Sequence, residues 1–207
     1  MASDTLFRQK APEIMRLLMG DFGLTVEDAA AVVGNLGHES AGFRFLQEKK
    51  PLVPGSRGGW GWAQWTGPRR KAFEAYCARN DLDPASDKAN YGWLFVELKG
   101  SEAKAIPAVK KARGLEEKIK AFELSFERAS PKYKHYPSRL IWAQKALAAF
   151  SEAPPLKAEP IPPEKPATSP PAAVIVPPAA STKGRLTKLT LAMVLVVIAA
   201  IAAVVFL

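Results

Sequence analysis

The stretch that decides the fold is Gly34-Asn35-Leu36-Gly37-His38-Glu39-Ser40-Ala41-Gly42-Phe43. A helix is predicted to lead into it, because Thr25 and Asp28 have the spacing of an N-terminal capping box. Apolar residues then recur at helical spacing up to Leu36, and Glu39 follows three residues later. The pattern therefore places one carboxylate on the face of the helix that is buried.

Glu39 is the candidate catalytic residue of this stretch. It is expected in the last turn of the helix, with Gly42 as a stop just beyond it. The negative end of the helix dipole and the apolar face both disfavour the ionised form, so both raise its pKa. A carboxylic acid that is protonated near neutral pH is what general-acid cleavage of a glycosidic bond requires. The alternative is a helix-end glutamate whose carboxylate lies in water.

A second segment packs three tryptophans and four glycines between basic residues: Gly58-Gly59-Trp60-Gly61-Trp62-Ala63-Gln64-Trp65-Thr66-Gly67-Pro68-Arg69-Arg70. Glycines let a backbone approach a ligand closely. Tryptophans offer flat faces to sugar rings, and Gln64 offers both a donor and an acceptor. Arg69 and Arg70 stand near the start of a predicted helix, where cations oppose the dipole. They face either a substrate cleft or solvent.

The two segments together resemble a known family. Glu39-Ser40 followed by Gly61-Trp62-Ala63-Gln64 is similar to the Glu-Ser…Gly-Leu-Met-Gln signature of lytic transglycosylases and goose-type lysozymes. The fuller pattern resembles the phage tail lysozyme family more closely, over roughly residues 10–150. It consists of Gly34-Asn35-Leu36 to Glu39-Ser40, Gly59 to Gln64-Trp65-Thr66-Gly67 with Arg69-Arg70, and Phe122 to Phe126-Glu127-Arg128.

The resemblance implies an all-α, lysozyme-like fold that cleaves the β-1,4 bond between N-acetylmuramic acid and N-acetylglucosamine, with Glu39 as the catalytic residue. A non-catalytic peptidoglycan-binding protein and a lytic transglycosylase that forms anhydro products are the alternatives. In the transglycosylase route the N-acetyl group or 6-hydroxyl of the sugar replaces a second acid. The residues predicted to bind the glycan are Ser40, Trp60, Gly61, Trp62, Gln64, Trp65, Arg69 and Tyr91.

A second catalytic carboxylate is not evident. Asp21 and Glu48 are the nearest candidates, but neither has a spacing that supports the role. Glu127 is interpreted as an ion-pairing structural residue, with lining of the cleft as the alternative. Tyr91 belongs to an aromatic stripe at helical spacing, which is more often core than cleft.

Composition limits the partners. The chain has 207 residues and a formal net charge of +9, which suits an anionic partner such as peptidoglycan. Nucleic acid is not expected, because the basic residues are scattered and no nucleic-acid-binding motif occurs. The single cysteine, Cys77, is expected to be a buried thiol. The two histidines, His38 and His135, are far apart in sequence, so neither a metal site nor a cofactor is predicted.

Three parts are predicted: a lysozyme-like domain over residues 5–150, a proline-rich linker over 151–185 and a single transmembrane helix over 186–207. Ten of the 18 prolines fall between Pro154 and Pro178. The run from Leu189 to Leu207 is apolar apart from Thr190. As a helix it would reach about 28 Å, close to the thickness of the hydrocarbon core of a bilayer.

The charges beside this apolar run predict its orientation. Lys183, Arg185 and Lys188 precede it and no charge follows, so the catalytic domain is expected on the cytoplasmic face of the host inner membrane. The N-terminus lacks the pattern of a secretory signal peptide. Access to peptidoglycan would then require a membrane lesion, such as one made by a phage holin.

Other helices are expected in the lysozyme-like domain. The first begins at Pro12 and ends at Gly20. A possible N-cap at Asp83 or Ser86 precedes a later one. The remaining predicted helices cover residues 68–80, 90–99, 106–114, 115–129 and 139–150.

Overall fold

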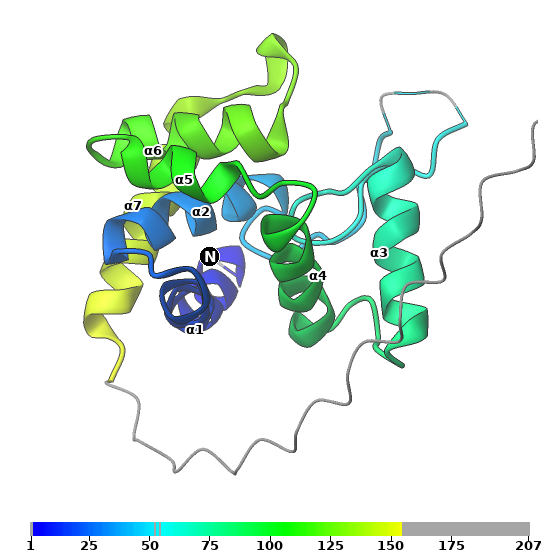
Figure 1. Cartoon of the computed structure of the whole chain (residues 1–207), viewed down its shortest axis with the longest axis horizontal. Helices are drawn as coiled ribbons and strands as arrows, with labels where there is room; N and C mark the ends of the chain where they lie inside the picture. The colour runs from blue at the N-terminus through cyan, green and yellow to red at the C-terminus, as the bar shows by residue number, and fades with distance from the viewer. Residues whose placement is uncertain (1, 52, 54, 155–207) are drawn as a thin grey trace, which may run out of the picture. The chain divides into compact units, whose positions relative to one another are not determined.

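The computed structural model describes residues 2–51, 53 and 55–154. Within these residues the chain is helical and contains no strand, so the predicted all-α class is confirmed for this part (Figure 1). The α-helices are α1 Ala2–Phe22, α2 Val26–Glu39, α3 Gly67–Arg79, α4 Asp87–Lys99, α5 Ala105–Lys111, α6 Leu115–Phe122 and α7 Tyr136–Glu152. A π-turn, Glu123–Glu127, follows α6, and a 3-10 turn, Pro131–Tyr133, precedes α7.

Helix α2 lies at the centre of the domain, packed against α1, α6 and α7. Its predicted capping box is confirmed: Thr25 Oγ1 accepts from the Asp28 backbone N–H, and Asp28 Oδ2 accepts from that of Thr25. Gly34 allows α7 to approach closely, since a Cβ at this position would lie 2.6 Å from the Cβ of Ala143. The start of α2 and its contact with α7 together fix where Glu39 emerges.

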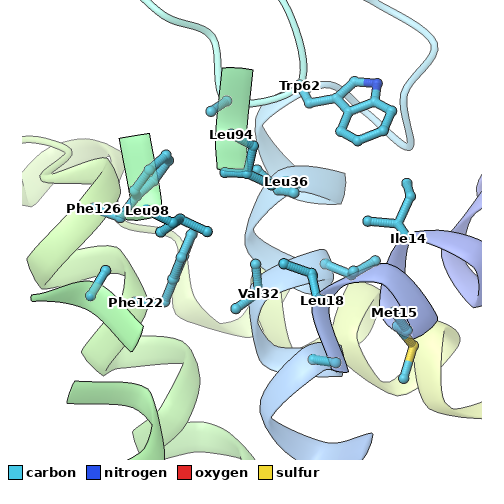
Figure 2. Packing of buried hydrophobic residues seen from close by; sticks show 14 of the residues in the cluster. Ile14, Met15, Leu18, Val32, Leu36, Trp62, Leu94, Leu98, Phe122 and Phe126 are labelled. Atoms are coloured by element: carbon cyan, nitrogen blue, oxygen red, sulfur yellow. The ribbon is translucent and has the colours of Figure 1, made fainter. Parts of the chain in front are cut away.

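The hydrophobic core lies between α2 and the helices around it. Figure 2 shows Leu18 of α1, Leu36 of α2, Leu94 of α4 and Phe122 of α6 converging there, and each is fully buried. Burial of side chains of this size is worth about 1.5–3 kcal/mol each, so the core holds the end of α2 firmly.

The loop between α2 and α3 is held by polar contacts in place of a regular sheet. Isolated bridges join Gln47 to Trp60 and Trp60 to Trp65. The guanidinium of Arg70 donates to Gln47 Oε1 and to the carbonyl oxygens of Arg57 and Gly58. Arg70 is therefore a buried support of this loop, and it does not form a solvated basic turn.

Two sequence-based boundaries are wrong. Helix α1 begins at Ala2 and contains Pro12 in its interior, although Pro12 was expected to start it. Packing of Phe7, Ala11 and Met15 in the core outweighs the loss of one helical hydrogen bond at proline. The helix expected over residues 115–129 ends at Phe122 and widens into the π-turn.

The other predicted elements agree with the structure to within a few residues. Ser86 caps α4, because its hydroxyl accepts from the backbone N–H of Ala89. Cys77 is buried, as predicted. Helix α7 extends to Glu152, two residues beyond the boundary predicted for the domain.

The predicted proline-rich linker, apart from its first residues, and the segment 186–207 predicted to be a transmembrane helix lie outside the described residues. Among the residues that are described, no helix combines the length and apolar character needed to cross a membrane.

Candidate active site

A cleft with a volume of about 590 Å³ opens at the C-terminal end of α2. It is formed by the end of α2, the loop before α3, the start of α3 and the segment that follows the π-turn. The lining residues are His38, Glu39, Glu48, Val53, Ser56, Gly58, Ala63, Gln64, Thr66, Arg69, Glu127, Arg128, Ala129, Ser130, Tyr133 and His135.

Glu39 is the last residue of α2 and its side chain is 21% exposed in the cleft. Its Oε1 accepts a hydrogen bond of 2.6 Å from Nη2 of Arg139. Burial raises the pKa of Glu39, and this effect exceeds the lowering caused by the charge and hydrogen bond of Arg139. The direction is the one expected for a general acid.

Arg139 of α7 is itself fully buried and held at three points. Besides Glu39, it donates from Nη1 to Asn35 Oδ1 at 3.0 Å and from Nε to the Lys134 carbonyl at 2.6 Å. A planar guanidinium fixed in this way also fixes the orientation of its carboxylate partner. Asn35, a member of the opening sequence stretch, therefore acts on Glu39 through Arg139.

Two further carboxyl groups line the same cleft: that of Glu48, whose Oε2 accepts from the Gly59 backbone N–H at 2.8 Å, and that of Glu127. Glu127 is the last residue of the π-turn, a rare distortion that is frequent at functional sites. Its Oε1 is buried and receives no hydrogen bond from the described residues. Burial and then the negative charge of Glu39 raise its pKa well above the usual range, although Arg69 and Arg139 oppose them.

Gln64 and Arg69 are the only predicted binding residues that join Glu39 in lining the described part of the cleft. The amide nitrogen of Gln64 contacts the carbonyl oxygens of Phe45, Leu46 and Gly61, so it holds the loop in place. Arg69 forms a two-pronged ion pair with Glu97 at 2.8 Å and donates to the Phe126 carbonyl. Arg69 thus ties α3 and α4 to the turn that carries Glu127.

Three predicted binding residues are buried, which does not fit a role in contacting a glycan. Trp62 and Trp65 are each 1% exposed, and Figure 2 shows Trp62 beside core residues. Trp65 also donates from its indole to Glu97 Oε2 at 2.6 Å. Ser40 is fully buried and closes the end of α2: its hydroxyl donates to the Leu36 carbonyl and accepts from the Phe43 backbone N–H.

The other three predicted binding residues lie outside the cleft lining. Trp60 is half-buried beneath Arg70, and its indole points to the Pro84 carbonyl. Gly61 has a φ of 81°, and a Cβ there would lie 2.5 Å from the Trp65 ring, so its role is to allow the turn. Tyr91 donates to Asp21 Oδ2 at 2.6 Å and lines a separate hollow with residues of α1 and α4.

Two histidines flank Glu39 in the cleft. The rings of His38 and His135 lie 5.6 Å apart, and His38 Nδ1 is 2.9 Å from Ser138 Oγ. Burial, followed by the charges of Arg139 and His135, lowers the pKa of His38 to about 4, so it is neutral at pH 7. Within the described part of the chain, no group of three or more His, Cys, Asp and Glu side chains could hold a metal ion.

Comparison with known proteins places the chain in a family. No curated protein and no solved structure matches it. The model of the phage tail lysozyme family matches residues 9–150, which includes the whole cleft and its three carboxyl groups, those of Glu39, Glu48 and Glu127. The chain therefore belongs to the phage tail lysozyme family, whose activity is lysozyme-like degradation of peptidoglycan.

Proposed function

We propose that this chain is a muramidase of phage lysis, which cleaves the β-1,4 bond between N-acetylmuramic acid and N-acetylglucosamine with Glu39 as the general acid. The observation that carries the proposal is a helix-end glutamate in the cleft whose pKa is raised by burial. Such a group keeps a proton closer to neutral pH than a solvated glutamate does, and it can donate that proton to the leaving oxygen.

Arg139 suits both protonation states of this reaction. Its charge opposes the effect of burial on Glu39, which prevents the proton from being held too tightly. After the proton has been transferred, the same guanidinium stabilises the carboxylate that remains, through the 2.6 Å hydrogen bond.

The test is Glu39→Gln, which keeps the shape of the side chain and removes the transferable proton. We expect a loss of about 10²–10⁴-fold in the rate of clearing of purified peptidoglycan, because that is the usual worth of a general acid. Glu117→Gln, at an exposed glutamate paired with Lys120, is the matched control and should retain full activity. Full activity of Glu39→Gln at an unchanged melting temperature would contradict Glu39 as the general acid, whereas absence of clearing by the wild type would support a non-catalytic binding protein.

Hydrolysis is proposed over transglycosylation because a further carboxyl group, that of Glu127, lies in the cleft with no hydrogen bond at its Oε1 from the described residues. A hydrolase needs a group that assists water or the glycosyl intermediate, whereas a transglycosylase uses the sugar itself. Mass spectrometry of the products separates the two. Reducing N-acetylmuramic acid ends are expected, and 1,6-anhydro ends would instead identify a lytic transglycosylase.

We also propose, on the sequence alone, that residues 186–207 anchor the chain in the bacterial inner membrane with the catalytic domain in the cytoplasm. Basic residues before the apolar run support this orientation. Release would then depend on a membrane lesion, such as one made by a phage holin. Cells that express the chain alone should lyse only after a permeabiliser is added, and spontaneous lysis would contradict the orientation.

A further inference from the structure

Glu127, which is half-buried, differs from the buried acidic side chains of the described domain in how its carboxyl group is paired. Glu97 is paired with Arg69, Glu102 with Arg128, and Glu123 accepts from the Tyr136 hydroxyl. The Oε1 of Glu127 has no such partner among the described residues. A buried polar group without a hydrogen bond costs stability, so the fold alone gives no reason for a carboxyl group at this position.

Glu127 lines the same cleft as Glu39. The two carboxyl groups interact electrostatically. The nearby cations are engaged elsewhere: Arg69 forms its two-pronged pair with Glu97, and Arg139 bonds to Glu39. Glu127 thus lines the cleft where the glycan would bind, and its buried Oε1 has no hydrogen-bond partner among the described residues.

We propose that Glu127 is the general base of the site and accepts a proton from the water that attacks the sugar. The inference rests on the function proposed above. Glu39 donates its proton to the glycosidic oxygen as the bond from that oxygen to C1 breaks. The water oxygen bonds to C1, and one water proton passes to the Glu127 carboxylate.

The proton count of the pair is unchanged by this step. One proton is held by Glu39 before the reaction and one by Glu127 after it, so transfer of that proton back to Glu39 restores the resting site. The electrostatic interaction between the two groups disfavours the state in which both are ionised. Burial, and the negative charge that Glu39 acquires when it gives up its proton, raise the pKa of Glu127 and favour uptake of the water proton there.

The experiment compares Glu127→Ala, Glu127→Gln and Glu39→Gln in the full chain, with purified peptidoglycan as the substrate. We expect each to lose about 10²–10⁴-fold in rate. Sodium azide is then added, because the azide ion attacks C1 without losing a proton. It should restore cleavage by Glu127→Ala, with a glycosyl azide detected by mass spectrometry, and should leave Glu39→Gln inactive.

Several results would overturn the assignment. Wild-type rates in Glu127→Ala, alongside an inactive Glu39→Gln, would contradict the general base and leave the proposed function intact. A loss in folded Glu127→Ala that azide does not restore would make Glu127 a positioning residue. Anhydro products from the wild type would show that water is not the nucleophile, and would therefore contradict a general base that activates it. Absence of any cleavage by the wild type would instead contradict the proposed function.

Melting temperatures show which variants are folded. If Glu127→Ala unfolds, Glu127→Gln takes its place in the comparison, because it preserves the shape of the side chain.

Discussion

Arg139 on α7 donates a hydrogen bond of 2.6 Å to Glu39 at the end of α2, and its own side chain is fully buried. The two residues are a hundred positions apart in sequence, so the protonation state of Glu39, the proposed general acid, depends on how α7 packs against α2. Breaking a buried pair by removing one partner usually costs about 3–5 kcal/mol. The pair therefore links the stability of the domain to the protonation of Glu39.

Substitution of Arg139 should move the pH dependence of catalysis. Arg139 lowers the pKa of Glu39, so Arg139→Met is expected to raise that pKa and shift the alkaline limb of the kcat/KM profile to higher pH. Arg139→Lys keeps the charge and should shift the limb less. The measurement is kcat/KM against pH on soluble glycan fragments, at a temperature where both variants are folded. An unchanged alkaline limb in Arg139→Met would show that another group sets it.

Glu127→Gln should stabilise the domain while it removes activity. The carboxyl group has no hydrogen bond at Oε1, and its folded pKa is raised above the unfolded value of about 4.3. The protonated form therefore favours folding at low pH, and this contribution is lost as the pH rises towards the folded pKa. Urea unfolding of both proteins from pH 4 to 8 should show the variant gaining stability over the wild type as the pH rises. A variant that loses stability throughout this range would contradict the prediction.

Glu97 should matter to the site without lining it. Its carboxylate accepts two hydrogen bonds from the Arg69 guanidinium and one from the indole N–H of Trp65. Arg69 also donates to the Phe126 carbonyl. Glu97→Gln leaves a buried cation without its partner, so we expect a loss of about 3–5 kcal/mol in the free energy of unfolding. Unfolding in urea measures this loss. Glu116→Gln, on an exposed part of α6, is the control and should unfold like the wild type.

Local signals in the sequence predicted the frame of the site. Thr25 and Asp28 marked the start of α2, and the periodicity up to Leu36 placed Glu39 in its last turn. These predictions succeed because capping and amphipathic spacing act over a few residues. Glu39 emerges from the core for the same local reason, and the raised pKa follows from that position.

The rest of the site depends on contacts that local patterns do not encode. Glu123 and Glu127 are four residues apart in the sequence whether the chain forms an α-helix or a π-turn. The sequence therefore did not show that a π-turn forms here or that Glu127 Oε1 has no partner among the described residues. No local pattern in the sequence indicates the role of Arg139, because its partners Asn35 and Glu39 lie about a hundred residues away in the chain. The family pattern that contains Phe126-Glu127-Arg128 was the one signal that pointed to this segment.

Trp62 is a residue whose burial the sequence did not predict, since tryptophans in a glycine-rich loop have no periodicity that separates a buried ring from an exposed one. In the structure Trp62 packs against Phe43, with ring centroids 5.1 Å apart, and is 1% exposed. Trp62→Ala should therefore cost about 3–5 kcal/mol in stability through the cavity it leaves. The KM of the folded fraction for soluble glycan fragments should remain unchanged.

Tyr133 is the matched comparison, because it lines the cleft and is 37% exposed. Tyr133→Ala should cost less in urea unfolding than Trp62→Ala, since over a third of the Tyr133 surface is already exposed, and should raise KM if its ring contacts the glycan. The two variants thus separate aromatic residues that build the loop from those that face the substrate. A raised KM in folded Trp62→Ala, together with a normal KM in Tyr133→Ala, would reverse this assignment and return the sugar-contacting role to the buried tryptophan.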